Sequence, residues 1–444
     1  MKKILIAFFV AFFVLSCTAF AAVVESGECG DNLTWALDGE GTLIIGGTGN
    51  MEDYYGAVSS PWYDYRSSIK NAVVENGVTS IGASAFYDCY NLISVKIPNG
   101  VTSVGKNAFY YCTGLTSIEI PGSITDIGDS AFYNCENLTS NIVIPKGVKS
   151  IGGYTFYGCE KLMSIEIPDS VTSIGIWAFY DCKKLTSIKI PDSVTSIENY
   201  AFTGCEYLTS IVLPKSVTSI GKRVFNNGCI SLERIDVDPD NPNYYSDEDG
   251  VLYNRDKTCL VSCPQKSTKT DGVKSIGNAA FNGCIGITRI EIPNSVISVE
   301  EDAFSYCKKL TSIKIPDSIT SIDDGAFDEC TNLEIVYYNG TEEEWNEIEI
   351  GYKNDALFEA EIIFNGVSEN VIDEKDGNDI KESSEIKGLQ TISVLEFVVN
   401  GENNVLIITV VMIVCVTVIV LLLIVGVTIV TVVLVNKKKK NKQQ

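Results

Sequence analysis

The chain has 444 residues, of which 45% are hydrophobic and 10% aromatic, so it is too apolar to be largely disordered. Its formal net charge of −23, with all 57 acidic residues between 22 and 404, argues against nucleic acid as a partner. Histidine is absent, which excludes Ser-His-Asp triads and His-containing zinc sites. We therefore expect no cofactor and no metal centre, and carboxylate-pair chemistry remains possible.

The residues that precede the repeats predict a signal peptide and a cap. Residues 1–21 begin with a basic pair, continue with a short apolar run and end on small residues, which is typical of a cleaved secretory signal. Lipidation at Cys17 is an alternative, because the sequence VLSC loosely fits a bacterial lipoprotein box. Residues 22–69 contain short apolar stretches separated by glycine turns, and these predict an N-terminal β-rich cap.

A repeat with a period of about 23 residues fills the segment 70–340. Each unit carries a cysteine, preceded by a phenylalanine three or four positions earlier. The cysteines of this column are Cys89, Cys112, Cys135, Cys159, Cys182, Cys205, Cys229, Cys284, Cys307 and Cys330. Their residue numbers differ by 23 or 24 from one member to the next, except for a difference of 55 after Cys229. A unit this small cannot bury its own core, so the repeat predicts coils that stack on one another.

The unit from Ala178 to Tyr200 shows how one coil is expected to form. Apolar residues alternate along LTSIKIP and predict a strand with Lys189 facing solvent, which Pro191 ends at a corner. A second extended piece, VTSI, follows, and AFYDC predicts a short helical or 3₁₀ turn. The side chains expected inside are Ala178, Phe179, Cys182, Leu185, Ile188, Ile190, Val194 and Ile197. The predicted fold is therefore an α/β solenoid of 23-residue coils.

An irregular insertion at 236–270 interrupts the array, and we expect a kink there. Asp236, Asp238 and Asp240 have the alternate spacing that opens a calcium loop, and Asp247 occupies its twelfth position. Two prolines and the lack of a central glycine favour a solvated acidic loop instead. Calcium binding at 236–247 is left open.

The residues after the array predict a cap and a stalk. In 341–366, Trp345, Leu357 and Phe358 are expected to cover the last apolar face. Residues 367–404 are acidic and polar, which is the composition of a flexible stalk.

A membrane anchor is predicted at the end of the chain. Residues 405–435 contain no charge, are long enough to cross a bilayer as one helix, and are followed by a lysine-rich tail at 436–444. Positive charge stays on the cytoplasmic side, so we expect a single-pass plasma-membrane protein with its N-terminus outside.

The pattern CxxLTSIxIPxSVTSIGxxAFxxC resembles the Treponema-type leucine-rich repeat of BspA-like surface proteins over about residues 70–340. The closing stretch NGTEEEWNEIEIG also resembles a segment that accompanies such arrays. The resemblance implies a curved, right-handed leucine-rich-repeat solenoid on bacterial or protist cells that binds host matrix proteins or other cells. It carries over no catalytic residues.

The cysteine column has two interpretations. An oxidising location favours disulfides, whereas one small apolar thiol per coil beside each phenylalanine favours a buried ladder, which we prefer. Outside the column, Cys259 and Cys263 are the pair that we expect to be bonded. The expected ladder consists of Phe86, Phe109, Phe132, Phe156, Phe179 and Phe202 with Cys89, Cys112, Cys135, Cys159, Cys182 and Cys205.

Two surfaces are candidates for binding. On the strand face, charged residues between the inward isoleucines can pair across coils or read a ligand: Lys96, Glu119, Glu166 and Lys189, with Glu291 and Lys314 further along. On the turns, a tyrosine follows the phenylalanine in five successive units: Tyr87, Tyr110, Tyr133, Tyr157 and Tyr180. Tyrosine offers a large rigid area and a hydroxyl, so this stripe is the sharper hypothesis for a binding surface, although repeat duplication also explains it.

The sequence therefore favours a non-catalytic cell-surface protein that binds protein or glycan partners in adhesion or recognition. A structural coat whose solenoids self-associate is the alternative, and a carboxylate-based hydrolase is a distant third because an open solenoid offers few deep clefts.

Overall fold

The computed structural model describes residues 22–365, with gaps at 56–59, 140, 265–266 and 271, and these residues belong to one compact unit. The predicted signal peptide 1–21, stalk 367–404, membrane helix 405–435 and tail 436–444 lie outside the described residues. Among the residues that are described, no helix is long and apolar enough to cross a membrane.

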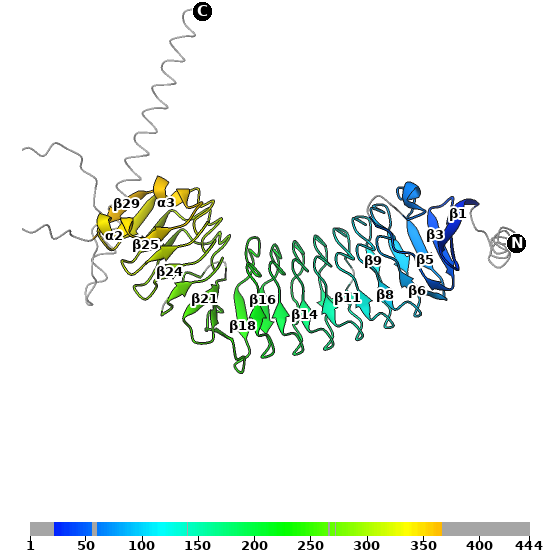
Figure 1. The fold of residues 1–444 in the computed structure, drawn as a ribbon, viewed down its shortest axis with the longest axis horizontal. Coiled ribbons are helices and arrows are strands. Elements are labelled where there is room, and N and C mark those ends of the chain that lie inside the picture. Colours follow the sequence, from blue (N-terminus) through cyan, green and yellow to red (C-terminus); the bar gives the residue numbers. More distant parts are fainter. Residues whose placement is uncertain (1–21, 56–59, 140, 265–266, 271, 366–444) are drawn as a thin grey trace, which may run out of the picture. The chain divides into compact units, whose positions relative to one another are not determined.

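The first strands form an antiparallel meander that closes the N-terminal end of the array (Figure 1). The meander is β1 (Val23–Gly30), β2 (Leu33–Asp38) and β3 (Thr42–Gly47), followed by β4 (Gly49–Asn50) and the 3₁₀ turn η1 (Tyr63–Tyr65). Trp62 is fully buried, donates from Nε1 to the carbonyl oxygen of Ala85 at 2.8 Å, and lies 5.9 Å from the ring of Phe86. This ring therefore covers the first phenylalanine of the array.

Two ladders of short parallel strands run through the repeats, each divided into separate sheets. Most coils contribute one strand to each ladder, but residues 185–190 form none, so the strand predicted in the coil at 178–200 is wrong, although its apolar side chains are buried as expected. The ladder of LTSI-type strands contains β5 (Asn71–Val74), β7 (Ser94–Lys96), β9 (Ser117–Ile118), β11 (Ile142–Val143), β13 (Ile165–Glu166), β16 (Ser210–Leu213), β18 (Arg234–Val237), β23 (Arg289–Glu291), β25 (Ser312–Ile315), β27 (Ile335–Tyr338) and β29 (Glu361–Phe364). The ladder of VTSI-type strands contains β6 (Val78–Ile81), β8 (Ser103–Val104), β10 (Asp126–Ile127), β12 (Ser150–Ile151), β14 (Ser173–Ile174), β15 (Ser196–Ile197), β17 (Ser219–Ile220), β22 (Ser275–Ile276), β24 (Ser298–Val299), β26 (Ser321–Ile322) and β28 (Glu349–Ile350).

The register of these ladders confirms the predicted solenoid of 23-residue coils. Ile174 pairs with Ile197, and Ser173 with Ser196, so equivalent residues of successive units lie side by side. The coils between β6 and β18 can be followed one after another in Figure 1. The residues expected inside the coil at 178–200 are all buried, including Phe179 and Cys182 at 0% exposure.

The short helical or 3₁₀ turn expected in each coil is wrong, because the described part of 70–340 forms only turns there. The backbone amides of this segment alternate between carbonyls of the next coil and carbonyls of the turn itself, as when the amide of Tyr157 donates to the carbonyl of Tyr154 at 3.1 Å. The amide of Tyr154 donates to the carbonyl of Ile176, and the amide of Phe156 donates to that of Ala178, both at 2.9 Å. Tyr154 adopts a φ of 57°, which lies in the left-handed region and breaks any helix. Within the described residues, the α-helices are those of the C-terminal cap.

The described part of the insertion extends the second ladder. It forms β19 (Tyr244–Ser246), β20 (Leu252–Asn254) and β21 (Cys259–Ser262), an antiparallel meander whose last strand pairs in parallel with β22. The side chain of Asn241 is fully buried, donates to the carbonyls of Pro214 and Val217, and accepts from the amides of Asn243 and Tyr244. The two donated bonds fasten the start of the insertion to the preceding coil, and the two accepted bonds hold the turn that follows Asn241. The core consists of two clusters, which meet at this insertion.

Two short helices, α2 (Glu342–Asn346) and α3 (Asp355–Glu359), cover the C-terminal end. Trp345 and Leu357 are buried as expected, and Trp345 packs edge-on against Tyr338 at 5.1 Å. Phe358 is 62% exposed, so its predicted place on the apolar face is wrong. Neighbouring residues of a helix point about 100° apart, and Leu357 already occupies the inward direction.

Candidate binding surfaces

The phenylalanine and cysteine columns form the interior behind the turns. Phe86 to Phe202 stack face to face, with ring centroids 5.2 to 5.5 Å apart. The thiols of the column from Cys112 to Cys229, and those of Cys307 and Cys330, donate to the carbonyl of the phenylalanine in the preceding coil, as Cys182 does to Phe156 at 3.2 Å. The 13 described cysteines are free. Burial raises the pKa of the Cys229 thiol to about 12, which keeps this thiol neutral and unreactive.

The expected disulfide between Cys259 and Cys263 is wrong. Cys259 begins β21 and Cys263 follows its last residue, so an extended chain of about 3.3 Å per residue separates them by roughly 13 Å. A disulfide joins Cα atoms less than about 7 Å apart. The Cys263 thiol donates instead to the carbonyl of Ser267 at 3.3 Å.

The five predicted tyrosines form one continuous stack on the turns. Their ring centroids are 4.9, 4.5, 4.4 and 4.8 Å apart along the series Tyr87, Tyr110, Tyr133, Tyr157 and Tyr180, with interplanar angles of 13° or less. Tyr87 is exposed and the other four are half-buried. The coil spacing of about 4.8 Å places equivalent side chains at this stacking distance.

Four further aromatic residues that the sequence analysis did not single out extend this stack: Tyr111, Tyr154, Trp177 and Tyr200. Tyr154 stacks on Trp177 at 5.7 Å, Trp177 lies 4.7 Å from Tyr200, and the Arg223 guanidinium lies 5.8 Å above the Tyr200 ring. The recurrence of Tyr154, Trp177 and Tyr200 at the same position of three successive repeats was a signal that could have identified them. We call the nine residues together the aromatic strip.

The outer members of the strip occupy an unusual backbone conformation. Tyr111, Tyr154, Trp177 and Tyr200 have φ between 56° and 59°. Bulky residues rarely adopt left-handed φ, which costs roughly 1 kcal/mol or more per residue and persists only where the surroundings fix it. Here backbone hydrogen bonds between coils fix this φ, as when the amide of Trp177 donates to the carbonyl of Asn199 at 3.0 Å.

The strip presents hydroxyls that stay protonated. Burial raises the pKa of Tyr110 to about 12, and neighbouring tyrosines add to the effect. The pKa values of Tyr87, Tyr133, Tyr157 and Tyr180 are raised as well, with burial as the main cause. The hydroxyls are therefore hydrogen-bond donors throughout the physiological pH range.

The strand-face candidates Lys96, Glu119, Glu166 and Lys189 are all exposed, but the structure does not bring them into the predicted ion pairs. Glu166 accepts a hydrogen bond from Asn141 at 2.8 Å. Among the described members of this column, the ion pair that forms is Lys314 with Glu291, at 2.6 Å. Long side chains at an exposed site gain little from pairing, so neighbouring polar groups compete successfully.

A hollow of about 660 Å³ lies on the strand face near the C-terminal end. Lys269, Arg289, Lys314, Glu334 and Tyr337 are among the residues that line it. Both signs of charge are present, so this hollow is a second candidate surface.

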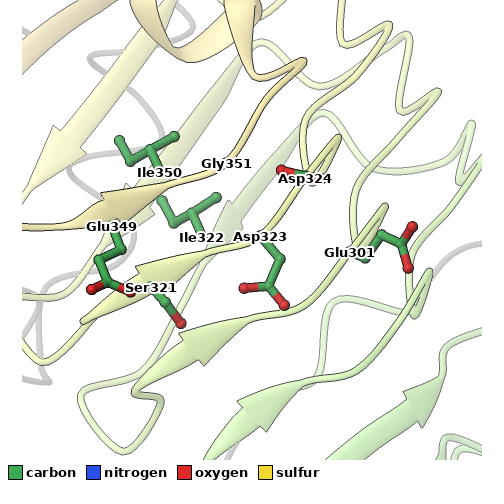
Figure 2. A pocket seen from close by; sticks show the side chains of 8 residues that line it. All are labelled: Glu301, Ser321, Ile322, Asp323, Asp324, Glu349, Ile350 and Gly351. Atoms are coloured by element: carbon green, nitrogen blue, oxygen red, sulfur yellow. The ribbon is translucent and has the colours of Figure 1, made fainter.

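A second hollow contains carboxylates from three successive coils, Glu301, Asp323 and Glu349, which Figure 2 shows spread along it rather than gathered at one point. Glu301 pairs with Lys222 at 2.7 Å, and this hydrogen-bonded ion pair lowers the pKa of the Glu301 carboxyl. A general acid requires a raised pKa, so Glu301 is not suited to that role.

The acidic residues of the insertion do not converge on a cation position. Asp236 is paired with Arg234 at 2.6 Å, and Asp238 accepts from the amide of Asp240. Asp247 accepts from the amides of Asp249 and Val251. Across the described residues, no group of three Asp, Glu, Cys or His side chains could hold a metal ion.

The described architecture has relatives among known proteins. The model of the BspA type leucine rich repeat region matches six copies, over residues 58–141, 139–246 and 256–350. A leucine rich cell surface protein from Faecalibacterium prausnitzii is 26% identical over 75% of this chain and 99% of its own, with a TM-score of 0.45. A leucine-rich repeat protein from Eubacterium ventriosum is 26% identical over 78% of this chain and 79% of its own, with a TM-score of 0.43. No curated protein matches. Because the family model covers more than half of the sequence, this chain belongs to the BspA-type leucine-rich repeat family.

Proposed function

We propose that this chain is a non-catalytic cell-surface recognition protein that binds extracellular protein or glycan partners through the aromatic strip. Membership of a surface-protein family supports the general role. The observation that carries the proposal is the strip itself, in which nine aromatic side chains from six successive coils gather on one surface. Aromatic side chains with a polar end dominate the binding energy of protein interfaces.

The change from tyrosine to polar residues at the position after the phenylalanine also supports the aromatic strip as the binding surface. In later coils the position after the phenylalanine is occupied by buried polar residues such as Thr203 and Asn282, which offer no comparable surface. Binding is therefore expected at the N-terminal half of the array.

The proposal is tested by measuring binding of the full chain to cells, immobilised matrix proteins and a glycan panel. One variant carries Tyr110→Ser, Tyr133→Ser and Tyr157→Ser. The matched control is Tyr306→Ser, because Tyr306 lies two positions after its phenylalanine, is exposed and has a φ of 59°, as Tyr111 has 56°. We expect saturable binding that the triple variant loses and the control keeps.

Two other outcomes contradict the assignment. Binding lost in a Tyr337→Ser variant and kept in the triple variant moves the site to the hollow on the strand face. Self-association of the chain without any foreign ligand supports the structural coat.

A further inference from the structure

We propose that the aromatic strip binds an extended, proline-rich polypeptide in the polyproline II conformation, with the peptide lying along the direction in which the coils stack. This inference rests on the proposed function and names the class of partner.

The exposed parts of the rings select the chemistry of the ligand. Both faces of Tyr133 are covered, by Tyr110 at 4.5 Å and by Tyr157 at 4.4 Å, and Trp177 lies between Tyr154 and Tyr200. A sugar would place its C–H groups against the negative face of an aromatic ring, but these faces are occupied. The strip offers ring edges, which are electropositive, together with hydroxyl donors, so it suits a ligand rich in carbonyl oxygens.

A proline-rich chain presents that surface. Polyproline II has no internal hydrogen bonds, so its carbonyl oxygens all point outward, and proline has no amide hydrogen. In the free chain the hydroxyls of Tyr110 and Tyr157 hydrogen-bond to that of Tyr133. In the complex these protonated hydroxyls would donate to the peptide carbonyls instead, without leaving any peptide donor unsatisfied. Aromatic-lined surfaces bind proline-rich segments in several other folds in this way, because the preformed helix loses little entropy.

The spacing of the strip matches the repeat of the same conformation. Two coils span about 9.6 Å at a strand spacing of ~4.8 Å, and the observed ring distances of 4.4 to 4.9 Å agree with this interval. One turn of polyproline II is about 9.3 Å long, whereas an α-helical turn is about 5.4 Å and two strand residues about 6.7 Å. Side chains at every third residue of the peptide would therefore meet equivalent sites on alternate coils.

The length of the strip gives a second quantitative expectation. Five coil steps separate Tyr87 from Tyr200, so the strip is about 24 Å long at ~4.8 Å per step. At about 3.1 Å per residue, roughly eight residues of polyproline II cover it.

Trp177 provides a built-in reporter for the test. The chain contains four tryptophans, and Trp35, Trp62 and Trp345 are buried, so Trp177 is the half-exposed one. The full chain, purified in a mild detergent, is titrated with tetraproline, octaproline and dodecaproline while tryptophan fluorescence and binding heat are recorded. Two comparison ligands are used: chitohexaose, and a Gly-Ser peptide of the same length as dodecaproline.

We expect saturable oligoproline binding whose affinity rises from tetraproline to octaproline and changes little from octaproline to dodecaproline. Tyr133→Ser with Tyr157→Ser should weaken it by about tenfold or more, and the Tyr306→Ser control should leave it unchanged. Tyr133→Phe with Tyr157→Phe keeps the stacked rings and removes two donors, so it should weaken binding by about threefold or more even if the serine variant fails to fold.

Several results would overturn the inference. These are the absence of saturable binding at millimolar oligoproline, equal binding of the Gly-Ser peptide, and binding that the phenylalanine variant does not change. Binding of chitohexaose alone, lost in the strip variants, would make the strip a glycan site. If oligoproline fails while the triple serine variant still loses a partner on cells or matrix, the inference falls and the proposed function stands.

Discussion

The cysteine column makes a prediction that separates buried thiols from disulfides. The full chain is alkylated with iodoacetamide at pH 8 in the absence of denaturant, and each cysteine is quantified by mass spectrometry. Burial raises the pKa of Cys229 and of Cys284 from 9.0 to about 12. This rise in pKa lowers the fraction of reactive thiolate at pH 8 by about 1,000-fold.

Cys259 is the internal standard, because it is the one half-buried thiol among the described cysteines. We expect Cys259 to be labelled first and the column to be labelled only after urea unfolds the chain, with no need for a reductant. Labelling of the column at the rate of Cys259 in the native protein would refute the buried ladder. Column cysteines that resist labelling in urea until a reductant is added would show that they are disulfides.

Three further predictions concern the core and the caps. Asn354→Leu should lower the free energy of unfolding by about 2–4 kcal/mol, because the Asn354 side chain accepts a hydrogen bond from the amide of Phe327 and donates to the carbonyls of Asp323 and Gly351. Asn332→Leu removes one exposed hydrogen bond, to the carbonyl of Lys308, and should change the free energy of unfolding by less than about 1 kcal/mol. Urea denaturation measures both changes. Phe156→Ala should lower it by about 3–5 kcal/mol, since it opens a gap between two stacked rings, and an unchanged urea midpoint would contradict the stacked core. The folded state favours the neutral thiol of Cys229, so stability is full below pH 9.0 and is lost as the pH rises toward about 12; a urea midpoint that stays constant over this range would contradict the burial of the column.

The interior of a coil could be predicted from the sequence because its constraint is local and repeated. Leu185, Ile188 and Ile190 are buried and the residues between them are exposed, as the apolar pattern predicts, although no strand forms there. Each register error would expose the same residues in every coil, so the repeat fixes the register strongly. The stack of tyrosines could be predicted in the same way, because the tyrosines recur at the repeat interval of 23 or 24 residues.

The conformation of the turns could not be predicted in this way. Trp177 and Tyr200 have low preference for left-handed φ, and the sequence AFYDC suits a helical turn as well. The deciding interactions are backbone hydrogen bonds between coils, such as the one that the amide of Phe179 donates to the carbonyl of Ala201 at 2.9 Å, and these depend on the neighbouring coil. Tyr154, Trp177 and Tyr200 recur at one repeat position in the sequence, but only the actual turn shows that Trp177 lies beside Tyr180.

The insertion also depended on distant contacts. Its acidic residues suggested a loop for solvent or calcium, whereas the buried side chain of Asn241 and the parallel pairing of β21 with β22 make it part of the sheet. The partners of Asn241, Pro214 and Val217, belong to the preceding coil and lie far from it along the chain. No local pattern indicates such a contact.

Hydroxyl-radical footprinting of the full chain, free and bound to a partner from the cell and matrix screen, tests most directly whether the aromatic strip is the recognition surface. Oxidation of each aromatic residue is read by mass spectrometry. We predict that the partner protects Tyr87, Tyr111 and Trp177 and leaves Tyr306 and Tyr337 as reactive as in the free chain. Protection of Tyr337 with an unchanged strip would contradict the account and place recognition on the strand face.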